Sequence, residues 1–280
     1  MDQLLNRPEI QTAVIPFIVA LLCYLGLKKF TASAWIWALF AAFLVTSSLI
    51  NGATLIPLTG TRKIILLILA SCLIAGLAPA VIQRVNLRRG ASAILGVLAI
   101  LWVFWKVLIR MEVTEMASLL VGGVVFVLWL TWVFGQLAGN QARLHGAGFS
   151  LLLGTGLSAI VGASALLGQI ALSLSVASGA VLLGWVLVGK AAGPGQPNRS
   201  IATLPYALAP ALCGLAAVIF ARVPWYALVP LASIPLVTKL LPGKPDSRFL
   251  AALAGSLPGL FIALAVAFWI WQTGASDSGY

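Results

Sequence analysis

Acidic side chains are scarce in this chain, and histidine is scarcer still. Among 280 residues there are six Asp and Glu and a single His. Zinc proteases and hydrolases with paired carboxylates need several such side chains close together. Between Glu9 and Asp246 the only acids are Glu112 and Glu115. We therefore expect no catalytic residues, no metal site and no cofactor.

The single histidine, His145, stands beside Arg143 in a predicted connector between two apolar segments. A lone histidine in such a place is more often solvated, or a helix cap, than a ligand. Carriers coupled to protons or sodium ions usually hold carboxylates or histidines within the membrane. Because no acid lies in the middle of an apolar segment, the sequence predicts no ion-coupling site of the usual acidic kind.

Cysteines are also few. Cys23, Cys72 and Cys213 each lie within an apolar segment and far from one another in sequence. No C-x-x-C pair or metal-ligand spacing is present. We expect three buried, reduced thiols.

Long apolar segments are what the chain has in abundance. Hydrophobic residues make up 61% and charged residues 8% of the chain, whereas soluble domains carry about 25% charged residues. Segments such as 64–70 and 91–104 are apolar without the alternation that a membrane β-barrel requires. The sequence therefore predicts an all-α integral membrane protein.

About twenty apolar residues cross a bilayer as a helix, and on that basis we expect about ten transmembrane helices. The connectors are short, so residues 1–280 are predicted to form a single polytopic transmembrane domain without an extramembrane domain. The divisions near Gly168 and Arg222 have almost no polar linker, which leaves eight or nine helices open. The expected spans are 11–27, 34–57, 64–83, 91–109, 114–138, 146–167, 169–189, 201–221, 224–241 and 249–271.

Lys and Arg set the predicted orientation. The net charge is +11, but the basic residues lie mostly at the ends of apolar segments, where they mark topology and touch lipid headgroups. We therefore expect membrane lipids and no nucleic acid as partners. Odd-numbered connectors carry eleven basic residues and the other side six. This bias places both termini outside the cytoplasm, and the short loops favour a bacterial inner membrane.

The densest charged cluster near an apolar segment is the first candidate for substrate binding. Lys106 and Arg110 share one helix face, because they are four residues apart, and Glu112 and Glu115 follow at once. Charges of this kind mark a site, or they anchor a helix end at the membrane interface. Asn51, at the end of the second span, is a further candidate for a polar ligand.

Small residues are concentrated in the sixth and seventh spans. Gly154, Gly156 and Ala159 match G-x-G-x-x-A, but no strand or soluble βαβ unit surrounds them, so we interpret them as helix-packing residues. The two spans are predicted to form a packed centre, or a face for a protein partner or a second copy of the chain. The candidate packing residues are Gly154, Gly156, Gly162, Gly179 and Gly184.

A faint internal repeat appears at a shift of 190 residues, and it would relate helices 1–3 to helices 8–10 in opposite orientations. Leu22, Cys23, Leu25, Phe30 and Trp35 match Leu212, Cys213, Leu215, Phe220 and Trp225. Prolines occur in these two triplets and not in the middle spans. Inverted repeats and interrupted helices are typical of carriers.

Three functions are compatible with the sequence. The first is a small-molecule carrier or exporter without an acidic coupling site, favoured by length, helix number and prolines. The second is a non-catalytic anchor or scaffold subunit of a larger complex, favoured by short loops and the absence of chemistry. The third is a lipid-handling protein that grips phosphates with basic residues such as Arg84, Arg88 and Arg89.

Overall fold

The computed structural model describes residues 7–31, 33–52, 56–81, 85–188, 200–221, 223–241 and 247–276. Side chains of 78–81, 85–89, 200 and 274–276 are excluded from the description. The arginines 84, 88 and 89, and the connector 190–199, therefore lie outside what is described.

Every element of the described part of the chain is helical, which confirms the all-α class. Nine of its helices are long and apolar enough to cross a membrane, and the segment Trp225–Leu240 is a shorter apolar helix in the place of the expected tenth span. The α-helices are α2 (Ile15–Leu27, after a π-helical turn Ile10–Val14), α3 (Ala34–Asn51), α4 (Gly60–Val81), α5 (Val85–Leu108), α6 (Val113–Leu137), α7 (Gln141–Val161), α8 (Ala165–Val188), α9 (Leu204–Phe220), α10 (Leu228–Leu240) and α11 (Arg248–Ser276).

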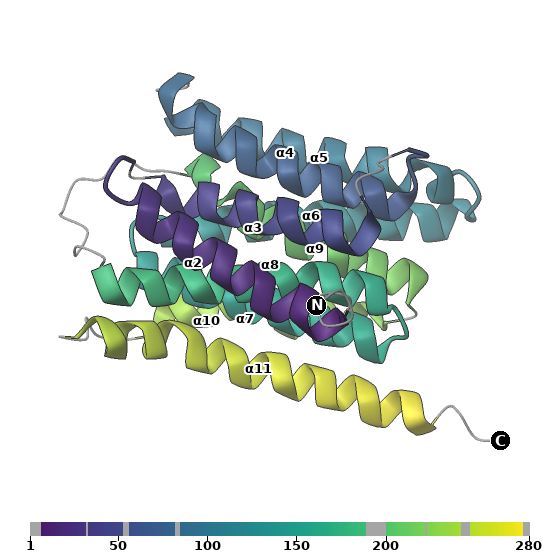
Figure 1. The fold of residues 1–280 in the computed structure, drawn as a ribbon. Helices are drawn as coiled ribbons and strands as arrows, with labels where there is room; N and C mark the ends of the chain where they lie inside the picture. Colours follow the sequence, from purple (N-terminus) through teal and green to yellow (C-terminus); the bar gives the residue numbers. More distant parts are fainter. Residues whose placement is uncertain are drawn as a thin grey trace.

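The helices run roughly along one axis and form a bundle with two ends (Figure 1). One end, called here the α7 end, is where α2, α6 and α8 finish and α3, α7, α9 and α11 start. The N-terminal helix starts and α11 finishes toward the opposite end. A chain whose first helix starts and whose last helix finishes toward the same end runs along the bundle an even number of times. The short α10 is therefore one of ten helices in the described part of the chain that run along the bundle axis.

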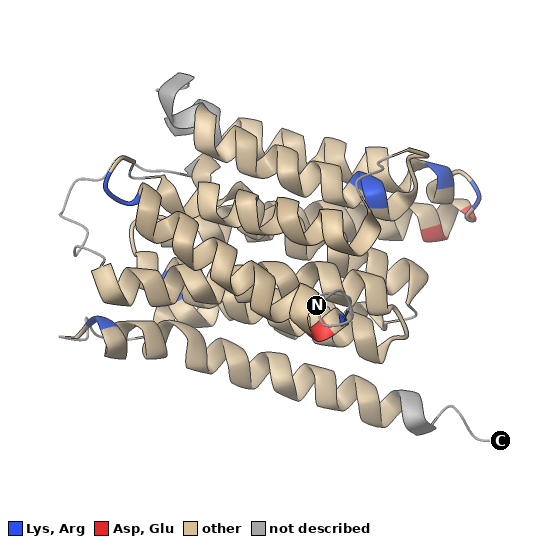
Figure 2. Cartoon of the chain, viewed as in Figure 1, with Lys and Arg blue, Asp and Glu red and all other residues tan. Residues whose placement is uncertain are grey.

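Most charged residues in the part drawn in colour lie toward the two ends of the bundle (Figure 2). The core lies in α7, α8 and α9, whose most apolar windows are 72%, 67% and 83% buried, compared with 22% for the N-terminal helix. α7 packs most extensively against α11 and α8. Many large apolar side chains are exposed, as expected for a surface that faces lipid.

Two predicted spans end earlier in the structure than the sequence suggests. The second is predicted to reach residue 57, but α3 ends at Asn51 because Gly52 follows with φ 70°. A residue with positive φ cannot continue a right-handed helix, and glycine adopts it at little cost.

The sixth span is predicted to reach residue 167, but α7 ends at Val161 in a Schellman motif. The Ser164 N–H donates to Ala159 O over 2.8 Å, and the Ala163 N–H donates to Ile160 O over 3.0 Å. Ala163 has φ 71°, in the place that glycine usually occupies. The sequence hides this helix end because the usual glycine signal is missing.

The faint inverted repeat is not visible in the packing of the described residues. α2 packs along α3, whereas their expected counterparts α9 and α10 make little contact with each other. Pro210, Pro235 and Pro258 lie inside α9, α10 and α11. The repeat therefore stays a prediction from the sequence alone.

Candidate functional site

His145 lies inside the bundle, which differs from the interpretation of this residue as solvated or capping. Its side chain is buried, because α7 begins at Gln141 and not at the predicted residue 146. Asn140 is the true N-cap, and its side chain accepts a hydrogen bond from the Arg143 N–H over 3.1 Å. The imidazole is therefore about 6 Å, four residues of helix rise, inside the start of α7.

Four side chains from three helices form one hydrogen-bond network, called here the His145 network. His145 Nδ1 is 2.8 Å from the Tyr206 hydroxyl oxygen, and His145 Nε2 is 2.9 Å from Gln141 Oε1. Ser178 Oγ is 2.9 Å from the same Tyr206 oxygen and 3.1 Å from the His145 carbonyl oxygen. The network thus joins α7, α8 and α9 within a buried part of the bundle.

The hydrogen-bond inventory fixes the direction of these bonds. Gln141 Oε1 can only accept, so the neutral imidazole carries its hydrogen on Nε2 and donates it to Gln141. Nδ1 is then the acceptor for the Tyr206 hydroxyl, and the Ser178 hydroxyl donates either to the Tyr206 oxygen or to the His145 carbonyl. Each donor in the network has an acceptor.

Aromatic rings enclose the network. Trp35 stacks on Tyr206 with centroids 5.5 Å apart and an interplanar angle of 2°, and it meets the His145 ring edge-on at 5.1 Å. Phe134 stacks on Tyr206 at 5.8 Å. Gly148 leaves room for the tyrosine, because a Cβ there would come within 2.5 Å of Tyr206 Cδ1. The Tyr206 ring is therefore held by α3, α6 and α7.

Further polar groups lie around this cluster. Trp35 Nε1 and the Tyr24 hydroxyl are buried without a hydrogen-bond partner among the described residues. Lys28, at the end of α2, has Nζ 5.5 Å from the Tyr24 ring centroid and interacts electrostatically with His145. The Arg143 guanidinium donates to the carbonyls of Lys239 and Leu241, over 3.0 and 2.8 Å. Lys28 and Arg143 thus place two cations at the α7 end of the bundle.

The charged cluster predicted from the sequence is at the opposite end of the bundle. Lys106, Arg110, Glu112 and Glu115 are all exposed, around the turn between α5 and α6. Among the described residues, no ion pair joins these acids to a cation; the carboxylate of Glu112 does not cap α6 either. These residues are therefore neighbours along the chain at the end of a helix, but the structure shows no ion pair between them among the described residues.

Asn51 also lies at that end, and its side-chain amide donates to Ser47 O over 3.4 Å within α3. The described parts of α3 make little contact with α5 or α6, so Asn51 does not join the cluster from Lys106 to Glu115.

The predicted packing glycines lie where other helices come close. A Cβ at Gly154 would be 2.6 Å from Leu231, one at Gly156 would be 2.9 Å from Leu172, and one at Gly184 would be 2.6 Å from Tyr24. A Cβ at Gly162 would be 2.5 Å from Ala221 O, and one at Gly179 would be 3.3 Å from Phe149. These neighbours belong to the same chain, so little of this face is free for a second copy.

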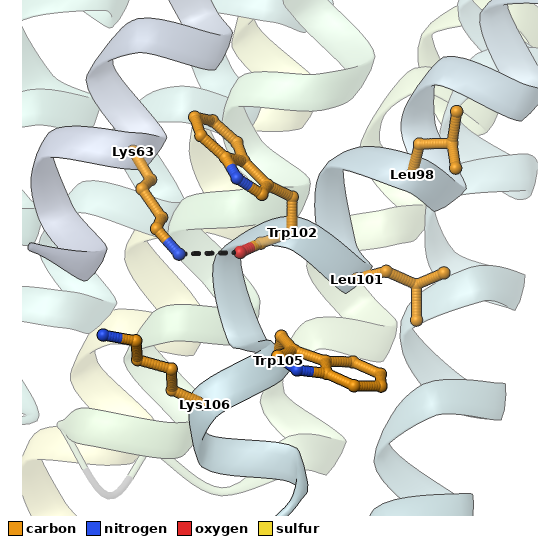
Figure 3. A pocket seen from close by; sticks show the side chains of 6 residues that line it. All are labelled: Lys63, Leu98, Leu101, Trp102, Trp105 and Lys106. Atoms are coloured by element: carbon orange, nitrogen blue, oxygen red, sulfur yellow. Dashed lines mark hydrogen bonds between the residues drawn. The ribbon is translucent and has the colours of Figure 1, made fainter. Parts of the chain in front are cut away.

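A shallow groove of about 500 Å³ lies on the outer face of α5, near the opposite end (Figure 3). Lys63 Nζ donates to Trp102 O over 3.0 Å and lies 5.3 Å from the Trp102 ring centroid. Trp105 and Lys106 complete the polar and aromatic part of the lining, and both ammonium groups lie on the same side of α5. This combination is typical of a membrane interface, where rings and amines meet headgroups.

Cys72 and Cys213 are buried and Cys23 is partly buried, all three as free thiols. Among the described residues no group of three or more His, Cys, Asp and Glu is arranged to hold a metal ion.

No protein-family model, curated protein or solved structure matches this chain.

Sequence reasoning missed Tyr206, Ser178 and the burial of His145. Tyr206 gave one signal, as the only hydroxyl within the otherwise apolar segment 204–220. A hydroxyl in such a segment is costly in lipid unless it is paired.

Proposed function

We propose that this multi-pass membrane protein is a small-molecule carrier or exporter whose polar centre is the His145 network. The observation that carries the proposal is the buried imidazole, which is bonded to the Tyr206 hydroxyl of α9 and belongs to a network that also includes Ser178 of α8. Ionisable groups within membrane bundles are costly, and they mark substrate and ion pathways. An anchor or scaffold subunit has no need for one, since apolar and small residues suffice for helix packing.

The position of the network suits a carrier that opens at the α7 end. His145 is about one helical turn from that end, and the cations Lys28 and Arg143 lie beside it. The conformer described here is closed, because His145 and Tyr206 are at most 1% exposed. Transport requires a second conformer in which water and substrate reach these groups.

Efflux from proteoliposomes tests the proposal. Vesicles loaded with a defined mixture of amino acids, sugars, nucleosides and organic acids would be followed by mass spectrometry, with protein-free vesicles as reference. We expect some compounds to leave only vesicles that contain the protein, and more slowly with Tyr206→Phe. Ser173→Ala is the matched control, because Ser173 is buried in α8 but bonds only to Ile170 O of its own helix.

Identical efflux from loaded vesicles with and without protein would count against a carrier. In that case a protein partner recovered in stoichiometric amount from the native membrane would support the scaffold function, which would then also explain the Gly-rich α7 and α8.

A second candidate function, lipid handling, rests on the groove lined by Lys63, Trp102, Trp105 and Lys106. Two amines beside two rings suit a phosphate headgroup, with its acyl chain along Leu98 and Leu101. Native mass spectrometry would show a retained anionic phospholipid that is lost in Lys63→Gln/Lys106→Gln. Equal retention in both proteins would reduce the groove to ordinary interface anchoring.

The proposed orientation puts the α7 end in the cytoplasm of a bacterial cell and both termini outside. Lys29 at the α7 end and Lys106 at the opposite end are exposed, so both suit single-cysteine labelling. A membrane-impermeant maleimide added to intact cells should label Lys106→Cys and spare Lys29→Cys; the reverse pattern would invert the topology.

A further inference from the structure

We propose that His145 binds and releases a proton within this network, and that the proton drives or gates the movement of the carrier. This inference rests on the proposed function for its role in transport, but proton binding itself can be tested without any substrate. The ligand is a proton taken from water, so that the neutral imidazole becomes an imidazolium.

The neutral arrangement uses three bonds in one direction. His145 Nε2–H donates to Gln141 Oε1, the Tyr206 hydroxyl donates to His145 Nδ1, and the Ser178 hydroxyl donates to the Tyr206 oxygen, over 2.9, 2.8 and 2.9 Å. The Ser178 hydroxyl has only one hydrogen, so in this arrangement it does not donate to the His145 carbonyl.

A second arrangement accommodates one more proton on the same heavy atoms. Nδ1–H of the imidazolium now donates to the Tyr206 oxygen, and the Tyr206 hydroxyl turns to donate to Ser178 Oγ. The Ser178 hydroxyl in turn donates to the His145 carbonyl, 3.1 Å away. Every donor again has an acceptor, and only two hydroxyl hydrogens have rotated.

The carbonyl contact allows the network to hold one more proton. A structural histidine needs a single set of bonds, for which Gln141 and Tyr206 suffice. The second arrangement requires the Ser178 contact to His145 O, because it gives the Ser178 hydrogen a place when Tyr206 becomes the donor; a neutral imidazole allows the contact but does not require it. The geometry therefore fits a group that changes its proton number.

The charges around the imidazole explain why proton binding would be linked to movement. Among the described residues, the titratable or charged groups near it are Lys28 from the end of α2 and Tyr206 from α9, with Cys72 of α4 near Tyr206. Arg143, two residues earlier on α7, donates instead to the carbonyls of Lys239 and Leu241. The acids in the described part, Glu9, Glu112 and Glu115, are exposed, and Glu112 and Glu115 lie at the opposite end, around the turn between α5 and α6. Among the described residues no acid pairs with His145. An imidazolium without a counter-ion is costly in a dry site, so its proton favours a conformer in which water reaches the network.

The chain contains one histidine, so protein labelled with ¹⁵N only in histidine gives a single imidazole spectrum. The full chain in lipid nanodiscs would be titrated from about pH 4 to about pH 9, with the unperturbed histidine value near the middle of this range. We expect the Nε2–H tautomer at high pH and conversion to the doubly protonated ring as the pH falls. Tyr206→Phe should change the proton affinity several-fold, up to about tenfold, because a hydrogen bond to the ring is lost.

Ser173→Ala is the control for this titration, and it should match the unmodified protein. The inference is overturned by an imidazole that keeps one neutral tautomer over the whole pH range in which the bundle stays folded. It is also overturned if Tyr206→Phe titrates as the unmodified protein does. Whether the imidazole takes up a proton while the bundle stays folded is measured on the unmodified protein, so a variant that fails to fold does not prevent the test.

Transport data separate this inference from the proposed function. Efflux that depends on a pH gradient in the unmodified protein, and proceeds without that dependence in His145→Gln, supports both. An imidazole that titrates in a protein without any efflux leaves the proton site standing and removes the carrier. Efflux with no pH dependence, together with an imidazole that does not titrate, refutes proton binding by His145 but supports the carrier function.

Discussion

Gly148→Ala perturbs the network without removing any of its polar atoms. The new Cβ would lie 2.5 Å from Tyr206 Cδ1 and Cε1 and 3.1 Å from Cγ, so the ring or α7 would have to shift. The ring has little freedom, because it is stacked between Trp35 at 5.5 Å and Phe134 at 5.8 Å. Overpacking of this kind costs about 1–3 kcal/mol, and a strained bond to His145 adds up to about 1 kcal/mol.

The matched control is Gly122→Ala, because Gly122 lies inside α6 with nothing within 4 Å of an added Cβ. Alanine there should be neutral or stabilise by up to about 1 kcal/mol through helix propensity. The same gain applies at Gly148 and cancels in the comparison, so we expect the two variants to differ by about 1–4 kcal/mol.

Reversible unfolding in mixed micelles with increasing sodium dodecyl sulfate, followed by circular dichroism, measures this difference in the free energy of unfolding. The single imidazole resonance should also shift in Gly148→Ala and stay in place in Gly122→Ala. Equal stability of the two variants, with an unshifted imidazole, would refute the tight packing of Tyr206 against α7 on which the site depends.

Three further predictions use the same unfolding assay. Ser178→Ala should destabilise by about 1 kcal/mol, because the network loses the single Ser178 hydroxyl, which contacts the Tyr206 oxygen and the His145 carbonyl; a loss no larger than that of Ser173→Ala would contradict this. Ala163→Gly should stabilise by roughly 0.5–1 kcal/mol, since φ 71° is costly for alanine, and a destabilised protein would mean that the Schellman turn is absent. Glu112→Gln and Glu115→Gln should each stay within about 0.5 kcal/mol, because both acids are exposed and unpaired at the end of the bundle; a drop in efflux in either variant would return the cluster to the candidate sites.

The membrane class and most of the spans could be predicted because they depend on the apolar segments themselves. Lipid leaves the backbone few options, so length and hydropathy decide where a helix runs. Helix ends depend instead on a few local bonds. Gly52 carried a recognisable signal, whereas Ala163 did not, and α7 therefore ends six residues before its predicted limit of 167.

The site was harder to predict because it is made by packing three helices that are distant in sequence. His145 is separated from Ser178 by 33 residues and from Tyr206 by 61, and nothing in their local sequence shows that they meet. The predicted start of α7 also placed His145 outside the span, beside Arg143. Asn140, as the actual N-cap, adds the turn that carries the imidazole into the bundle.

The hydrogen bonds between helices indicate which contacts a moving carrier would have to break. α7 is held to α8 by Ser175, which donates to Phe149 O, and to α11 by Ser150, which donates to Ser256 O. α9 packs against α4 and α6 as well as α7, and Tyr206 is its only hydroxyl. The bond between Tyr206 and the α7–α8 pair is therefore the polar link between α9 and this pair. A proton that reverses this link acts at the boundary where α9, with α4 and α6, would separate from α7, α8 and α11.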